Sequence, residues 1–389
     1  MGIYLDNSAT TKISPEALDK YREVSERLYG NPSSLHTLGF LAESEIKAAK
    51  AAILSSLSER DSEVIFTASG SEANNLAIIG RAFAKRRYRN TSARIITTDS
   101  EHASVNAPLD MLSDEGIEIV KVPTVGGVID TDALRTLCTK NVILVSLMMV
   151  NNETGALYDV SAAARIVRAA CPEALIHVDA TQSYLKIPFT KKSILADMIT
   201  VSSHKVHGPK GVGALIVDKK VITARGLAPV IYGGGQGLGL RSGTENVPGI
   251  AAFAEAVKIA HASLAARREK ITTLRERLLG RLSTDEGLAE IKPITPEAYA
   301  PHILSVTLPG IKSETMLHYL SSRDIFVSSG SACSSNSAHK KSALVSYGVS
   351  PRDADFSIRI SFSHENTEED VDALANALCD GLTKLARTK

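Results

Sequence analysis

Polar residues able to do chemistry gather at the ends of several predicted strands. Five clusters follow such strands: Ser69-Gly70-Ser71, Glu101-His102, Asn151-Asn152-Glu153, Asp179-Ala180-Thr181-Gln182 and Ser202-Ser203-His204-Lys205. In open α/β sheets, active sites lie at the carboxyl ends of the strands, which meet at one edge. We therefore expect the five clusters to line one shared site.

An acid and a lysine in these clusters suit pyridoxal 5'-phosphate. Asp179 ends one buried strand and Lys205 follows the next, so the two side chains should come close in space. The cofactor needs a lysine amine for its Schiff base and a carboxylate that keeps its pyridine nitrogen protonated. One alternative is a surface lysine with an aspartate that caps a helix. Another is a zinc pair formed by His204 and His207, which has no carboxylate or cysteine as a further ligand. We expect no metal site.

A cradle for the cofactor phosphate is also expected. Gly70 and Ser71 follow a strand and open a helix, so backbone N–H groups and the helix dipole would point at an anion. Ser202 and His204 could add donors, and the alternative is a plain helix cap. The glycine-rich run at residues 233–237 resembles a nucleotide loop only superficially, because it follows no βαβ unit and lacks a Walker lysine.

The elements that carry these residues alternate between helix and strand from about residue 14 to residue 217. The expected strands are residues 63–67, 94–98, 117–122, 142–150, 175–179, 198–202 and 213–217. Amphipathic stretches such as residues 72–88 and 161–170 separate them. This alternation predicts an α/β fold with a mostly parallel sheet and helices on both faces.

The pattern changes after a glycine-rich stretch at residues 232–243. A long helical pattern covers residues 245–282, and it is followed by strand 303–308, helix 313–321, strands 325–328 and 356–361, and a helix from about residue 367. A chain of 389 residues exceeds the usual limit for a single core. We predict a large domain of residues 15–260 and a small α+β domain made of residues 1–14 and 261–389.

The composition argues against some function classes. A formal net charge of +1 provides no long-range field that would attract nucleic acid or an anionic membrane, so neither is expected as a direct partner. The longest apolar run, residues 142–150, is too short to span a bilayer, and the N-terminus has no pattern of a secretion signal. Four widely spaced cysteines without a CxxC pair indicate reduced thiols and a cytoplasmic location.

Many spaced motifs resemble those of cysteine desulfurases, in order from residue 4 to about residue 371. They are YLDNSATT (4–11), GNPSSLH (30–36), FTASGSEANNLAI (66–78), EH (101–102), VNNETG (150–155), HVDATQ (177–182), SSHKVHGPKGVG (202–213), RSGT (241–244) and SGSACS (329–334). The resemblance implies a fold-type-I pyridoxal-phosphate enzyme of the class V aminotransferase group, acting as a homodimer. The large domain would contain a mostly parallel seven-stranded sheet.

The resemblance also assigns cofactor-binding roles. Lys205 would form the Schiff base and Asp179 would hold the pyridine nitrogen. Gln182 would bond to the ring hydroxyl, while His102 would stack on the ring and handle protons. The phosphate would be held by Gly70, Ser71, Ser202 and His204, and by Thr244 of the other subunit. Ser71 stands where threonine is common, which keeps the hydroxyl, and Gly237 stands where an acidic residue is frequent.

Substrate roles fall on three further residues. Asn152 and Arg359 would bind L-cysteine, with Arg359 holding the carboxylate as a planar two-point donor. Lys205 would take the Cα proton, and Cys333 would attack the substrate sulfur, become a persulfide and leave L-alanine. The sulfur would pass to an acceptor such as an iron–sulfur scaffold or a tRNA-thiolation carrier.

Cys333 decides between reactions, since transamination needs no thiol. It lies in a stretch of small residues, 328–338, which we expect to be mobile and exposed. Lys340 and Lys341 nearby could favour the thiolate, although an incidental cysteine in a serine-rich loop is the alternative. The other three cysteines are expected to be inert packing residues. Competing functions are a selenocysteine lyase, a sulfinate desulfinase, an aminotransferase, or a cofactor-holding scaffold without turnover.

Overall fold

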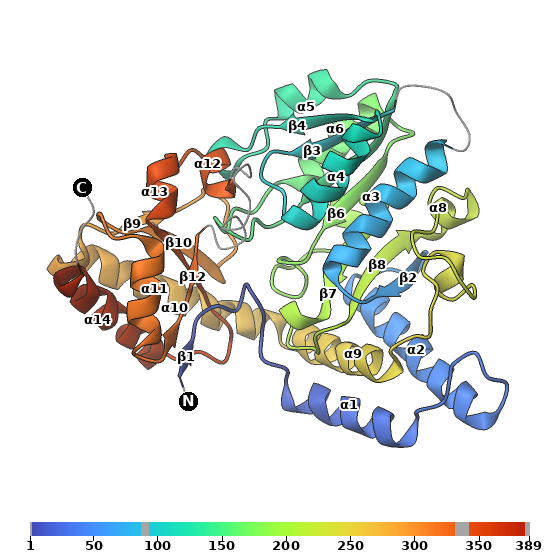
Figure 1. The fold of residues 1–389 in the computed structure, drawn as a ribbon, viewed down its shortest axis with the longest axis horizontal. Coiled ribbons are helices and arrows are strands. Elements are labelled where there is room, and N and C mark those ends of the chain that lie inside the picture. The colour runs from blue at the N-terminus through green and yellow to red at the C-terminus, as the bar shows by residue number, and fades with distance from the viewer. Residues whose placement is uncertain (1, 87–92, 331–341, 386–389) are drawn as a thin grey trace.

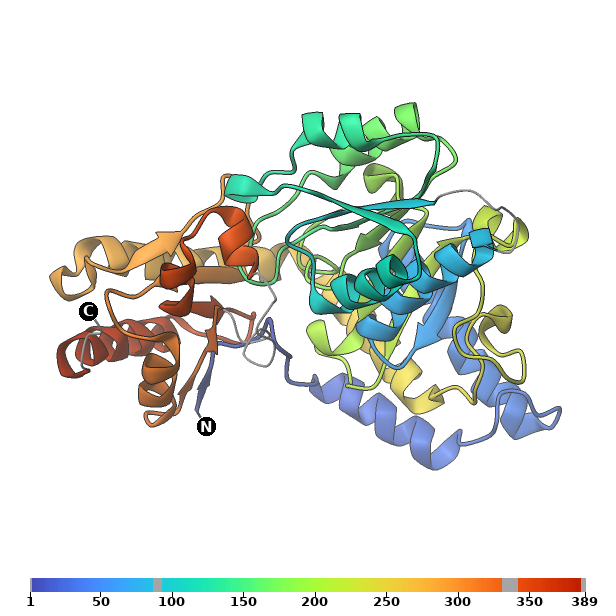
Figure 2. The ribbon, with the colours of Figure 1, turned by 45° about the horizontal axis from the view of Figure 1, so that its top comes forward.

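The chain forms two bodies that lie side by side, joined by a long bent pair of helices (Figure 1). The structure is a computed structural model that describes residues 2–86, 93–330 and 342–385. The larger body is built on a seven-stranded sheet and the smaller body on a four-stranded sheet. Both ends of the chain lie on the smaller body, which the turned view in Figure 2 also shows.

The seven-stranded sheet has the order β2-β8-β7-β6-β5-β3-β4. Its strands are β2 (Ser62–Thr67), β3 (Arg94–Thr98), β4 (Glu118–Val122), β5 (Val142–Met148), β6 (Leu175–Asp179), β7 (Met198–Ser202) and β8 (Gly213–Asp218). The pairs from β4 to β7 are parallel, and β8 runs antiparallel to both of its neighbours. The expected strands and the mostly parallel sheet are therefore confirmed, and the ends of the strands agree within two residues.

Both faces of this sheet are buried. Alternate residues of each strand point to opposite faces, and each face is covered by helices. Val145 of β5 joins the cluster that contains α2, α6 and α9, whereas Leu144 beside it joins the cluster that contains α3 and α4. The helices of the larger body are α1 (Pro15–Arg27), α2 (Thr37–Ser56), α3 (Gly70–Arg86), α4 (Ala103–Asp114), α5 (Thr131–Leu137), α6 (Val160–Ala170), α7 (Lys191–Ile194), α8 (Lys219–Thr223) and α9 (Val247–Ala262).

The smaller body packs helices on an antiparallel sheet of order β12-β13-β10-β9. Its elements are β9 (Lys292–Ile294), β10 (Ile303–Thr307), β11 (Ile325–Phe326), β12 (Ser328–Ser329), β13 (Ser357–Ser361), α10 (Leu264–Thr284), α11 (Ser313–Ser321), α12 (Ala343–Tyr347), α13 (Pro351–Asp355) and α14 (Glu368–Lys384). The domain boundaries near residues 14 and 260 stay a prediction.

Two expectations for this region are wrong. The single strand expected at residues 325–328 is two strands, because β11 pairs with β1 (Ile3–Tyr4) while β12 pairs with β13. The single helix expected at residues 245–282 is α9 and α10, bent by 73°. The bend lies at Ser263, whose hydroxyl donates to the Ile259 carbonyl at 2.7 Å, a side-chain bond that competes with helix continuation.

In the described part of the chain, no single helix is long and apolar enough to cross a membrane. The bent pair α9 and α10 reaches such a length and composition only when the two helices are taken together.

The N-terminal segment is hydrogen-bonded to both bodies and runs beside the candidate site. The backbone N–H of Asn7 donates to the Ser361 carbonyl at 3.2 Å in β13. Four residues later, the N–H of Thr11 donates to the His204 carbonyl at 2.8 Å, next to the end of β7. The segment between them is thus fixed at both ends and runs across the carboxyl edge of the large sheet.

Candidate active site

One cavity of about 330 Å³, which we call the strand-end cavity, collects most of the predicted site residues. It lies where β2, β5, β6 and β7 end, and β12 and β13 of the smaller body close it. The predicted residues that line it are Gly70, Ser71, His102, Asn152, Asp179, Gln182, Ser202, His204, Lys205 and Arg359. The sheet edge brings together clusters that are far apart in the sequence.

Lys205 extends into this cavity from the turn after β7. Its ammonium donates to the carbonyl of Ser8 and, at 2.8 Å, to that of Ala9. The amide of Gln182 also donates to the Ser8 carbonyl, at 2.9 Å. The N-terminal segment therefore positions both side chains, a contact that no local pattern in the sequence indicated.

Asp179 lies at the end of β6 and is 6% exposed. Its two carboxylate oxygens accept from the Thr181 N–H at 2.9 Å and from the Asn74 amide at 2.8 Å. His177 lies two residues earlier in β6. Burial lowers the pKa of its imidazole to about 4, although the charge of Asp179 acts to raise it. The carboxylate is thus held rigidly, with a neutral ring as its neighbour in the sheet.

A hydrogen-bonded chain joins Asp179 to His102. Asn74 donates to Asp179 and also to the Ser104 hydroxyl at 2.9 Å. The Ser104 N–H donates to His102 Nδ1 at 3.1 Å, so this nitrogen is an acceptor and a neutral ring carries its proton on Nε2. Asn74 and Ser104 were missed from the sequence. Asn74 lies four residues after Gly70 in α3, and that spacing places both on one helix face.

One part of the cavity lining fits a phosphate. Gly70 and Ser71 form the start of α3, where N–H groups lack partners within the helix. The Ser202 hydroxyl is buried without a hydrogen-bond partner among the described residues. A Cβ at Gly213 would lie 2.4 Å from the Ser69 carbonyl carbon, so only glycine lets β8 approach this turn. A buried orphan hydroxyl and a helix start suit the phosphate of pyridoxal 5'-phosphate, and Asp179, which lines the same cavity, suits its ring nitrogen.

The rings of His204 and His207, the alternative zinc pair, contact different partners. The His204 ring contacts the Thr10 hydroxyl at 3.1 Å, and burial lowers its pKa to about 4, with Lys205 adding to the effect. The His207 ring contacts the Lys12 carbonyl at 2.9 Å instead. In residues 2–86, 93–330 and 342–385, no group of three or more His, Cys, Asp or Glu is arranged to hold a metal ion.

Arg359 occupies the side of the cavity formed by β13. Its guanidinium donates to the Asn152 carbonyl and to the Asp6 carboxylate, both at 2.9 Å. Its Nε is buried and has no hydrogen-bond partner in the described ranges. Since a guanidinium has five N–H donors, Arg359 is anchored and still keeps donors for an anionic group.

The two remaining predicted site residues are Cys333 and Thr244. Cys333 falls at residues 331–341, outside the described residues. Gly330, three residues before it, lines the cavity, and its N–H donates to the Ser357 carbonyl at 2.8 Å. Ser342, just after the same stretch, donates to the Glu153 carboxylate at 2.6 Å. Thr244 is exposed and lies away from the cavity within this chain.

Glu101, next to His102, is a buried carboxyl behind the cavity wall. Burial raises its pKa from 4.5 to about 8; bonds from Met148 N–H and Thr98 oppose this effect, and the charge of Asp179 adds to it. One oxygen accepts from Thr98 and from the Met148 N–H, and the other is buried without a partner in the part of the chain that the structure describes. At neutral pH this carboxyl is mostly protonated in the folded protein.

We therefore expect Glu101 to make the folded protein less stable as pH rises from 6.5 to 8. The folded state keeps the Glu101 proton there and the unfolded state does not, which lowers the free energy of unfolding by about 2 kcal/mol across this window. Groups with a lowered pKa act in the opposite direction, His177 between about 4 and 6.5 and Lys186 at higher pH, so the Glu101 contribution is the difference in slope between variants. In urea titrations at pH 6.5, 7.25 and 8, Glu101→Gln should gain stability relative to the wild type as pH rises, whereas exposed Glu276→Gln should keep the wild-type slope. An unchanged slope in Glu101→Gln would contradict the assignment.

Comparisons with known proteins identify the family of the chain. The sequence profile of a family described as Aminotransferase class-V matches residues 3–374. A NifS/IcsS protein homolog from Lactobacillus delbrueckii subsp. bulgaricus is 37% identical over 375 residues, covering 95% of this chain and 94% of that protein. Cysteine desulfurase IscS from Vibrio atlanticus is 35% identical over 378 residues, covering 95% and 90%. A solved NifS-like protein has a TM-score of 0.90 at 34% identity, covering 99% of this chain and 100% of its own.

Proposed function

Because the chain belongs to the aminotransferase class-V family, we propose that it is a pyridoxal-phosphate-dependent cysteine desulfurase, which removes sulfur from L-cysteine and releases L-alanine. One observation carries the proposal: Lys205, Asp179 and Arg359 line the same cavity at the edge of the sheet. The relatives named cysteine desulfurase support the same activity over nearly the full length of the chain.

The cofactor would be held by residues from three sides of the strand-end cavity. Lys205 would attach it, Asp179 would keep its ring nitrogen protonated, and His102 would lie against its ring. Gln182 would bond to the ring hydroxyl. The phosphate would be bound by Gly70, Ser71, Ser202 and His204. When bound, pyridoxal 5'-phosphate acts as an electron sink for a carbanion at the substrate Cα.

The chain's own groups would then handle the substrate. Arg359 would bind the carboxylate of L-cysteine, with Asn152 beside it, and the Lys205 amine would take the Cα proton. The Cys333 thiolate would attack the substrate sulfur and form an S–S bond as the C–S bond breaks. The electron pair of that bond stays on carbon, which is protonated to the methyl group of alanine, and Cys333 is left as a persulfide.

The position of Cys333 in the sequence supports this role. It lies three residues after Gly330, which lines the cavity. Covalent geometry allows its Cα to lie anywhere within about 11 Å of the Gly330 Cα. Delivery of sulfur to an acceptor, such as an iron–sulfur scaffold or a tRNA-thiolation carrier, belongs to the same proposal, and nothing in the chain chooses between them.

A homodimer is part of the proposal as well. Large apolar side chains are exposed near the segment between α1 and α2 and in the glycine-rich stretch before Thr244, and exposed apolar clusters mark interaction sites. These side chains are Tyr29, Leu35, Phe40, Tyr232 and Leu238. In a dimer, Thr244 of one subunit would complete the phosphate site of the other. The cytoplasmic location stays a prediction.

Turnover by the purified protein tests the function. With pyridoxal 5'-phosphate, L-cysteine and a thiol reductant, we expect equal amounts of L-alanine and sulfide over many turnovers per protein molecule. Without reductant, mass spectrometry should find one added sulfur atom on the peptide that contains Cys333. The same assay with L-alanine and a keto acid distinguishes an aminotransferase. Amino-group exchange without sulfide release would refute the proposal.

A further inference from the structure

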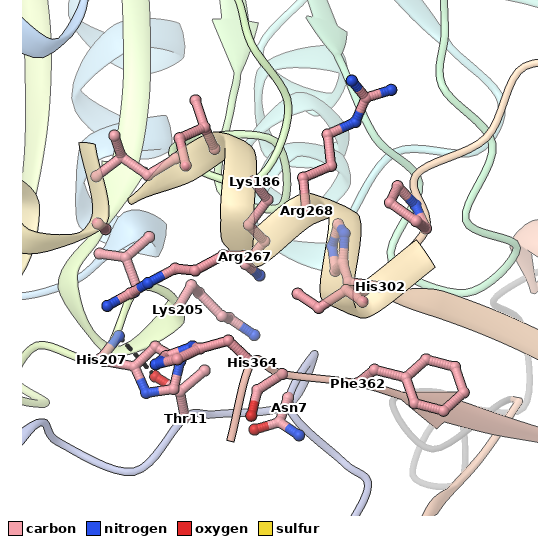
Figure 3. A pocket seen from close by; sticks show the side chains of 17 residues that line it. Asn7, Thr11, Lys186, Lys205, His207, Arg267, Arg268, His302, Phe362 and His364 are labelled. Carbon is pink, nitrogen blue, oxygen red and sulfur yellow. Dashed lines mark hydrogen bonds between the residues drawn. The ribbon is translucent and has the colours of Figure 1, made fainter. Parts of the chain in front are cut away.

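Lys205 also lines a second cavity, whose other lining residues differ from those of the strand-end cavity (Figure 3). It has a volume of about 40 Å³, and we call it the cationic cavity. The N-terminal segment, the turn after β7, the start of α10 and the loops at residues 301–302 and 362–364 enclose it. Its charged and titratable lining residues are Lys186, Lys205, His207, Arg267, Arg268, His302 and His364, and no carboxylate is among the described residues that line it.

His302 is the most constrained of these groups. It is 2% exposed, and neither of its ring nitrogens has a hydrogen-bond partner among the described residues. Burial lowers the pKa of the ring well below its usual value, and the charges of Lys186 and Arg275 lower it further. Even a neutral imidazole carries one N–H. This buried N–H is surrounded by cations and has no acceptor among the described residues. A ligand inside the cavity could supply one.

Lys186 faces the same space. Figure 3 shows its amine and that of Lys205 pointing into the cavity that His302 borders. One N–H of Lys186 is used by the Gln182 side-chain oxygen at 3.1 Å, and an ammonium has three donors. Burial lowers the pKa of Lys186 well below its usual value, and repulsion from Lys205 and Arg359 adds to the effect.

The other described lining groups bring no carboxylate next to Lys186. His207 is engaged with the Lys12 carbonyl and packs edge-to-face on His364, with ring centroids 4.7 Å apart. The guanidinium of Arg268 points away from the cavity (Figure 3). The carboxylates that act on Arg267 are Glu16 and Glu365, and neither lines the cavity. Buried charges are normally paired, so the cavity has the character of an anion site.

We infer that the cationic cavity binds one small monovalent inorganic anion, of the class of chloride, with Lys186 and His302 as its donors. The volume exceeds the 10–15 Å³ or so that a single water needs, and it is too small for a phosphate ester or an amino acid. An anion here gives the His302 N–H an acceptor and Lys186 a counterion. It also reduces the repulsion between Lys186 and Lys205. The inference does not depend on the proposed function.

Bromide tests this site directly, because its anomalous scattering distinguishes it from water. Crystals of the wild-type protein soaked in sodium bromide should show an anomalous peak between the Lys186 amine and the His302 ring. The same position should be empty of anomalous signal in crystals soaked in sodium gluconate. Ordinary water density without a bromide peak would overturn the inference, whether or not the protein turns over cysteine.

Thermal unfolding gives an independent measurement on the protein as purified. The midpoint should rise with chloride or bromide more than with gluconate at equal ionic strength, because an anion that binds only the folded state stabilises it. Lys186→Met should weaken the apparent halide affinity at least about tenfold. Lys258→Met, which removes an exposed ammonium on α9, should leave the halide response unchanged. Equal responses in halide and gluconate, or an intact response in Lys186→Met, would also overturn the inference.

Discussion

Lys205→Ala is expected to lower cysteine turnover by a factor on the order of 10³ or more, through loss of the proton-transferring amine and of the covalent attachment of the cofactor. The Lys205 amine lies in the cavity that also contains Asp179 and Arg359. Borohydride reduction followed by peptide mapping should place a pyridoxyl adduct on the wild-type peptide that contains Lys205. The variant should give no such adduct while its unfolding midpoint stays close to that of the wild type.

Two nearby lysines provide the controls. Lys210 is exposed and follows Lys205 by five residues, so Lys210→Ala should keep both the adduct and the activity. Lys186 is half-buried, lines the cationic cavity together with Lys205, and is the other amine able to compete for the cofactor. An adduct mapped to Lys210 or Lys186 in the wild-type protein would require a different site.

The residues at the carboxyl ends of the strands are the part of the site that could be predicted from the sequence. Asp179 and Lys205 could be paired from the sequence because a parallel sheet places successive strand ends at one edge. β6 and β7 are indeed neighbours, with Asp179 opposite Thr200. The apolar runs that predicted the strands are buried on both faces, so their composition alone identified them.

The residues that escaped prediction act through contacts between distant segments. Asn74 was visible within a motif, but its bond to Asp179 depends on how α3 packs against the sheet. The Ser8 carbonyl meets Lys205 across 197 positions of sequence. β11 and β12 separate because β1 supplies a partner to one of them. Contacts between segments so far apart leave no periodic pattern in the sequence. They therefore cannot be predicted from one sequence without the fold.

The cationic cavity also arises from segments that are far apart in the sequence. Lys186, His302 and His364 come from three separate turns, and nothing in the sequence around each of them indicates a binding site. Arg267 and Arg268 lie within a helical pattern, and Arg268 is an exposed side chain. Burial and the absence of a nearby carboxylate among the described lining residues, rather than residue type, distinguish this cluster.

Cys333→Ala is expected to reduce alanine formation from L-cysteine by a factor on the order of 10³ or more, since a covalent nucleophile is lost. Cys138 and Cys171 are not expected to replace it. Burial raises the pKa of Cys138 to about 12, with the neighbouring Cys171 adding to the effect, and burial also raises the pKa of Cys171. Neither thiol is an effective nucleophile at neutral pH. Cys379→Ala, in α14, is the matched control and should keep full activity.

The same variant separates sulfur removal from selenium removal. Selenocysteine has a better leaving group, so its C–Se bond needs less help from an attacking thiolate than the C–S bond of cysteine. If the protein is a desulfurase, Cys333→Ala should lose sulfide release from L-cysteine and the persulfide on the Cys333 peptide, while Lys205 still carries the cofactor adduct. Full selenide release from selenocysteine in that variant, together with little sulfide release by the wild type, would instead assign the chain as a selenocysteine lyase. Retention of sulfide release in Cys333→Ala would remove the thiol from the mechanism altogether.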